Sequence, residues 1–114
     1  SRYTGVDIQA VESVSDLDII GVSKEAGVHI VASRDCRKFF ISGHSEYDRG
    51  TLAGEYERDV KKGINPNLPL HYFPDDDPDR LPLMTWRAHA NLLFSNWLNY
   101  FVYQRTPYDL EELE

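Results

Sequence analysis

Apolar and β-branched residues gather in three short runs near the start of the chain. The runs are residues 18–23, 28–33 and 38–42. Runs of this length and composition, bounded by polar or glycine-containing segments, are typical of β-strands. The two connections are too short for a crossover, so the strands are predicted to be antiparallel neighbours. Gly27 ends the first connection, where a tight turn often requires the positive φ that glycine tolerates.

After the third predicted strand, apolar residues no longer alternate with polar ones and instead recur every four residues. Residues at this interval are Leu52, Tyr56 and Val60. Their spacing predicts an amphipathic helix over residues 50–62. Thr51 or Asp48 is expected to cap the start of this helix, and Gly63 is expected to end it.

The last part of the chain divides into an irregular connection and a long helix. Residues 64–84 hold all but one of the six prolines, which predicts an irregular and stiffened segment. Its length favours a packed or functional loop over a plain linker. Residues 85–103 are predicted to form one helix, because their apolar residues recur at helical spacing and define a broad stripe. The stripe contains Trp86, Ala90, Leu93, Phe94, Trp97, Leu98 and Phe101.

Composition and charge narrow the class of protein. The 114 residues are 41% apolar, which suffices for the core of one compact domain. The formal net charge of −7 argues against a nucleic acid partner and against an anionic membrane surface. No window of about 18 residues is continuously apolar, and the first residues do not resemble a signal peptide. Cys36 is the one cysteine and has no internal disulfide partner, so a reducing cytoplasm is the expected location.

The segment from Gly43 to Asp48 carries the most informative chemistry. It follows an apolar run that is predicted to be a buried strand. Side chains alternate along a strand, so His44 and Glu46 are expected to face the same way if extended geometry continues. A carboxylate beside an imidazole fixes its tautomer and stabilises its protonated form, as for an oriented general base. On these residues alone, a solvated pair at the start of a loop remains the simpler explanation.

The sequence around this pair resembles the homoserine O-acyltransferases, the family of homoserine O-succinyltransferases and O-acetyltransferases. The similar segments are residues 1–4 (SRYT), 43–59 (GHSEYDRGTLAGEYERD), 71–79 (HYFPDDDPD) and 86–110 (WRAHANLLFSNWLNYFVYQRTPYDL). Together they cover most of the chain. The last segment is far more specific than a catalytic triplet, because its tryptophans, asparagines, tyrosines and glutamine follow the family's order.

This resemblance implies a class I glutamine amidotransferase-like fold, a flavodoxin-like three-layer α/β arrangement. Residues 1–114 would form the C-terminal portion of a single α/β acyltransferase domain, with short strands followed by two helices. The N-terminal half, which carries the family's nucleophilic cysteine, is expected to lie outside these residues. The chain by itself is therefore expected to be inactive.

The resemblance also implies a reaction and its residues. The family transfers an acetyl or succinyl group from acyl-CoA to the hydroxyl of L-homoserine in methionine biosynthesis, through a cysteine thioester. His44 matches the family's general base and Glu46 the acid that orients it. Arg58 matches an arginine that binds the substrate carboxylate, and Ser1 matches a substrate-binding serine. Acyl-CoA is a co-substrate and no other cofactor is expected; the expected assembly is a homodimer.

Other polar residues are not expected to form sites. Cys36 lies in a polar turn shortly before His44, whereas the family's cysteine lies far upstream on a strand-to-helix turn. The remaining histidines are His29, His71 and His89. They lack the compact spacing of a zinc site, so no metal is expected. The acidic run at residues 75–79 lacks the glycine and terminal glutamate of an EF-hand loop.

Two other functions stay open at this point. A glutamine amidotransferase half also ends a strand with a histidine and a glutamate, typically as His-Pro-Glu. Ser45 replaces that proline here, which favours the acyltransferase. The second alternative is a non-catalytic module whose apolar helix stripe docks on a partner.

Overall fold

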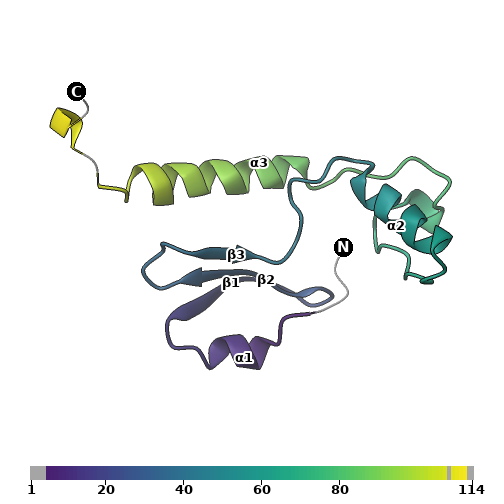
Figure 1. Ribbon diagram of the computed structural model, residues 1–114, viewed down its shortest axis with the longest axis horizontal. Coiled ribbons are helices and arrows are strands. Elements are labelled where there is room, and N and C mark those ends of the chain that lie inside the picture. Colours follow the sequence, from purple (N-terminus) through teal and green to yellow (C-terminus); the bar gives the residue numbers. More distant parts are fainter. Residues whose placement is uncertain (1–4, 108, 113–114) are drawn as a thin grey trace. The chain divides into compact units, whose positions relative to one another are not determined.

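A computed structural model describes residues 5–107 and 109–112 of the chain. These residues form an α/β structure with three strands and several helical segments (Figure 1). The elements are α1 (Ile8–Glu12), β1 (Leu17–Ser23), β2 (Gly27–Ser33), β3 (Phe39–Ile41), α2 (Thr51–Lys61), η1 (Pro74–Asp76), α3 (Arg87–Asn96), η2 (Trp97–Tyr103) and η3 (Leu110–Glu112). They belong to two compact units. One is Gly43–Ala88, and the other combines residues 5–42 with residues 89–112.

The second unit is built on an antiparallel sheet in the order β1-β2-β3. β2 is hydrogen-bonded on both sides and is the most buried strand, with Val28 only 2% exposed. The three strands lie where the sequence predicts them, and Gly27 takes the expected positive φ of 73°. α1 was not predicted, because five residues are too few to show helical periodicity. Its first turn is capped by Asp7, whose side chain accepts a hydrogen bond from the Ala10 N–H at 3.0 Å.

The helix predicted over residues 85–103 is present, but it is not regular throughout. Its second part, η2, has the wider turns of a π-helix, and the Gln104 N–H donates to the Asn99 carbonyl five residues earlier at 3.3 Å. This stretch contains neither glycine nor proline, so the sequence carries no helix-breaking signal there. Phe101 in η2 packs edge-on against Phe39 in β3, with ring centroids 4.8 Å apart.

The apolar stripe of α3 and η2 is mostly uncovered in the described chain. Ala90 is the one stripe residue that is buried there, and Trp97 is 40% exposed. A largely apolar cavity of about 490 Å³ is lined by residues from the sheet and from this helix, among them Ile20, Phe40 and Trp97. Separately, no described helix combines the length and apolar character needed to cross a bilayer.

The first unit is built around α2, which matches the predicted helix over residues 50–62. Gly63 follows its end with a φ of 72°, as expected. Residues 64–84 were predicted to be irregular. They are irregular apart from the short η1 turn. Buried aromatic side chains join the segment to α2: Phe73 contacts Tyr72 and Tyr56 edge-on, at centroid distances of 4.8 and 6.1 Å.

The predicted cap of α2 is wrong. The N-cap residue is Gly50, which has no side chain, and neither Thr51 nor Asp48 supplies a side-chain cap. The hydroxyl of Tyr72 performs this role instead, because it accepts a hydrogen bond from the Ala53 N–H at 3.1 Å. The same hydroxyl donates to the carbonyl of Arg49. A residue far along the chain therefore satisfies the first turn of the helix, which local sequence patterns do not reveal.

Removing this hydroxyl tests its structural role. Tyr72 is only 4% exposed, and Tyr72→Phe removes both of its part-buried hydrogen bonds, to the Ala53 N–H and to the Arg49 carbonyl. We expect the free energy of unfolding to fall by about 1–3 kcal/mol. Urea unfolding of the purified protein measures the change. The matched substitution Tyr103→Phe, at a ring that is 69% exposed, should stay within about 0.5 kcal/mol, and an equal loss in both variants would contradict the assignment.

Candidate active site

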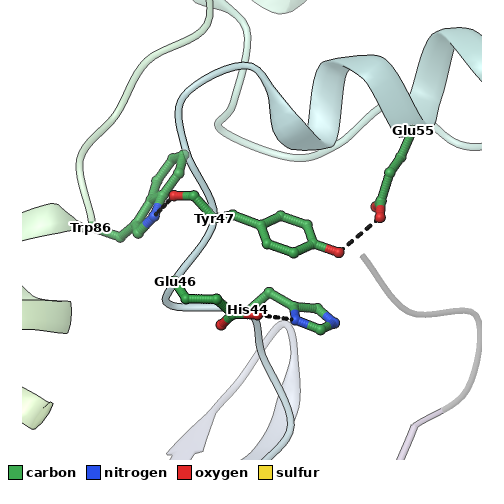
Figure 2. A network of polar contacts seen from close by, with 5 residues as sticks. All are labelled: His44, Glu46, Tyr47, Glu55 and Trp86. Atoms are coloured by element: carbon green, nitrogen blue, oxygen red, sulfur yellow. Dashed lines mark hydrogen bonds and ion pairs between the residues drawn. The ribbon is translucent and has the colours of Figure 1, made fainter.

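His44 and Glu46 lie side by side, as the sequence predicts (Figure 2). The distance from His44 Nδ1 to Glu46 Oε1 is 2.6 Å. The reason differs from the one expected, because β3 ends at Ile41 and the pair lies in a turn. The Tyr47 N–H donates to the His44 carbonyl in this turn at 3.4 Å. Turn geometry, and not the alternation of a strand, brings the two side chains together.

The charge state of Glu46 determines which imidazole nitrogen carries the proton. The hydrogen bond from His44 is the main cause that holds the pKa of the Glu46 carboxyl below its usual value of 4.5, and a bond from its own backbone N–H adds to it. At neutral pH the group is a carboxylate, which can only accept a hydrogen bond. Nδ1 of His44 must then be the donor, so in the neutral ring Nε2 holds the lone pair. Nε2 points away from Glu46 (Figure 2), which suits a general base.

Tyr47 forms a third part of this site that the sequence did not predict. Its ring stacks on the imidazole of His44, with centroids 4.4 Å apart and planes 13° from parallel. Its hydroxyl donates to Glu55 Oε1 on α2 at 2.7 Å. Its carbonyl accepts a hydrogen bond from Trp86 Nε1 at 3.1 Å. The only sequence signal was an aromatic residue next to the His-x-Glu pattern, and that gives no direction for the ring.

Arg58 lies on α2, as predicted, but its described ion pair is with Asp59. The Nε atom donates to Asp59 Oδ1 at 2.8 Å, and Asp59 is almost fully buried. About half of the Arg58 side chain is exposed, at 52%. Glu55 and Arg58 are three residues apart on the helix and therefore share one face. The helix face that carries Glu55 thus also carries Arg58.

The remaining predicted residues have simpler positions. Ser1 lies outside the described residues. Cys36 is a free thiol in the turn between β2 and β3, where its Sγ lies 3.8 Å from the Arg34 carbonyl oxygen. Within residues 5–107 and 109–112, no cluster of three or more histidine, cysteine or acidic side chains is arranged to hold a metal ion.

The contact between His44 and Glu46 predicts how this carboxyl titrates. Because the pKa of Glu46 is lower in the folded protein than in the unfolded chain, its contribution to stability is present above about pH 4.5 and is lost as the pH falls through the folded pKa. Carbon NMR of the Glu46 carboxyl in the purified protein should show a midpoint below 4.5. His44→Ala should raise that midpoint, since it removes the main donor. A midpoint that does not respond to His44→Ala would contradict this account.

Comparison with known proteins gives the context for this geometry. A family model described as homoserine O-succinyltransferase matches residues 1–108. Homoserine O-acetyltransferase of Acetivibrio thermocellus is 56% identical over 114 residues, which are all of this chain and 37% of that protein. Homoserine O-acetyltransferase of Brevibacillus brevis is 59% identical over 110 residues, 96% of this chain and 36% of that protein.

Relatives with the other name are similar to the same degree. Homoserine O-succinyltransferase of Photorhabdus laumondii is 56% identical over 110 residues, again 96% of this chain and 36% of that protein. The chain thus spans little more than a third of the length of these curated relatives. The resemblance expected from the His44 segment and from the last helix is confirmed. Since the family model matches residues 1–108, the chain belongs to the homoserine O-succinyltransferase family.

Proposed function

We propose that the complete protein transfers an acyl group from acyl-CoA to the hydroxyl of L-homoserine, a step in methionine biosynthesis. The hydrogen bond between His44 and Glu46 is the observation that carries this proposal. It gives the imidazole a fixed tautomer and a lone pair at Nε2, which is what deprotonation of an alcohol requires. The names of the relatives supply the reaction class, since each names homoserine as the acyl acceptor. Neither the amidotransferase half nor the interaction module gains support from these relatives.

The reaction would take place in two acyl transfers. A cysteine gives its thiol proton to His44 and attacks the acyl-CoA carbonyl, and coenzyme A leaves as a thiolate that takes up this proton. Homoserine then gives its hydroxyl proton to Nε2 while its oxygen attacks the thioester carbon. The carbon–sulfur bond breaks, the cysteine leaves as a thiolate, and the imidazolium returns the proton to it. Glu46 stabilises the imidazolium formed in each step.

Arg58 is proposed to bind the carboxylate of homoserine. A guanidinium can donate two parallel hydrogen bonds to a carboxylate, which lysine cannot reproduce. The Arg58 Nε donates to Asp59, and the terminal nitrogens of the guanidinium are the atoms proposed to donate to the substrate carboxylate. The buried Asp59 would then fix the direction of the guanidinium. Ser1 is proposed to contact the substrate as well, since a hydroxyl can both donate and accept.

The remaining parts of the proposal concern the longer protein. We propose that the nucleophilic cysteine lies in the part of the protein that extends beyond this chain, because Cys36 lies in a hairpin turn. That part would complete a class I glutamine amidotransferase-like, flavodoxin-like α/β domain and cover the apolar cavity between the sheet and the last helix. A homodimer in the cytoplasm is the proposed assembly, and acyl-CoA is the only small molecule required besides homoserine.

Substitution of His44 tests the reaction. In the complete enzyme, His44→Ala should lower kcat/KM for homoserine by about 10³-fold, since a positioned general base contributes about 10²–10⁴. A coupled assay of coenzyme A release measures this rate. His89→Ala, which removes an exposed imidazole from α3, is the matched control and should retain its activity. Full activity of His44→Ala would refute the proposal.

Substitution of Arg58 separates acceptor binding from donor binding. Arg58→Ala should raise the KM for homoserine by about 10- to 100-fold, because charge-assisted hydrogen bonds to the carboxylate are lost. The KM for acyl-CoA should change little. Lys61→Ala removes a cation from the same helix that is 78% exposed and serves as the control. An unchanged KM for homoserine in Arg58→Ala would exclude the assigned role.

A further inference from the structure

We infer that Tyr47 is a positioning residue for the general base: its ring supports one face of the imidazole, and Glu55 on α2 holds that ring in place. The inference rests on the proposed function, because it takes His44 as the base. Figure 2 shows the arrangement, with the phenol ring flat against the imidazole and its hydroxyl directed at Glu55.

The bond to Glu46 does not by itself fix the imidazole. The side chain of His44 is 49% exposed, and the torsion that rotates its ring is soft. A hydrogen bond at Nδ1 restrains this torsion only as firmly as its acceptor is held, and the Glu46 side chain is 60% exposed. The Tyr47 ring, 4.4 Å away and only 13° from parallel, blocks rotation of the imidazole on one face. Together the two contacts define both the plane of the ring and the direction of Nε2.

Tyr47 can support the imidazole because it is itself held at both ends. Its hydroxyl bond to Glu55 is 2.7 Å long and has a carboxylate as the acceptor, which makes it one of the stronger kinds of hydrogen bond. Its backbone carbonyl is held by Trp86 Nε1 at 3.1 Å. Trp86 in turn lies next to the buried ring of Tyr72, with centroids 6.2 Å apart. The stack is therefore tied to the core of its unit.

The same helix connects the stack to the proposed acceptor site. Glu55, which anchors Tyr47, is three residues before Arg58 and shares a helical face with it. One rigid element thus holds both the support for the base and the group proposed to bind the carboxylate of homoserine. A homoserine bound at Arg58 would present its hydroxyl to Nε2 at a separation that this element sets. Loss of the stack should therefore impair proton transfer and leave substrate binding in place.

Two substitutions of Tyr47 in the complete enzyme test this division. Tyr47→Leu removes the stacked ring and should lower kcat by about 10- to 100-fold, since small misplacements of catalytic groups have effects of this size. Tyr47→Phe keeps the stacked ring and loses only the hydrogen bond to Glu55. Its kcat should therefore fall much less than that of Tyr47→Leu. The KM for homoserine should stay within about twofold in both variants, because Arg58 is untouched. The matched control is Tyr56→Phe, which deletes the hydroxyl of a nearby tyrosine. The Tyr56 ring packs on Phe73.

A double-mutant cycle tests the anchor. Tyr47→Phe and Glu55→Leu remove the same hydrogen bond from its two ends. The double variant should therefore be no slower than the slower single variant, whereas independent effects would multiply. Glu55→Gln keeps an accepting oxygen and should lose less of kcat than Glu55→Leu. Multiplicative losses in the double variant would exclude the anchor.

Proton NMR of the imidazole reports the stack without any assay. The face of an aromatic ring shields protons above it, so the carbon-bound imidazole protons of His44 should move downfield in Tyr47→Leu and stay near their original position in Tyr47→Phe. An unchanged kcat in Tyr47→Leu, or an increase in the KM for homoserine that matches the fall in kcat, would overturn the inference. His44→Ala distinguishes failure of the positioning role from failure of the proposed function. Loss of activity there with normal activity in Tyr47→Leu refutes only the positioning role, and full activity in His44→Ala refutes the proposed function itself.

Discussion

The hydroxyl of Tyr72 makes the two hydrogen bonds on which the candidate site depends. It donates to the carbonyl of Arg49, just after the turn that carries His44, and accepts from the N–H of Ala53 in the first turn of α2. The buried ring thereby joins the turn to the helix at the point where the chain passes from one to the other. The Tyr47 hydroxyl bond to Glu55 crosses the same junction, from the turn to the helix. A flexible junction would separate the base from the helix that supports it.

The sequence predicted the features that depend on neighbours along the chain. The three strands, the α2 helix and the contact between His44 and Glu46 arise from residues at most a few positions apart. His44 and Glu46 are in contact although β3 ends at Ile41, before the pair. A turn, like a strand, can bring side chains two residues apart together. The specific residues of the last helix indicated the family correctly.

The features that the sequence did not predict depend on residues distant in the chain or on packing. Tyr72 caps a helix that begins 21 positions before it, as the bounds of α2 show. The orientation of Tyr47 is set by Glu55 and by Trp86, one on a helix and one after a proline-rich segment. A local pattern identifies such residues but not their partners. The π-helical turns of η2 are a different case, since the described structure gives no residue that causes them.

The exposure of the pair at the centre of the site indicates what its hydrogen bond is for. Glu46 is 60% exposed and His44 49%. Ion pairs this exposed add little to stability, because water and salt screen them. The consequence of the bond is instead directional: it assigns the proton to Nδ1 and the lone pair to Nε2. On the proposed function, this direction serves the acceptor, homoserine, which the acetyltransferases and succinyltransferases name in common.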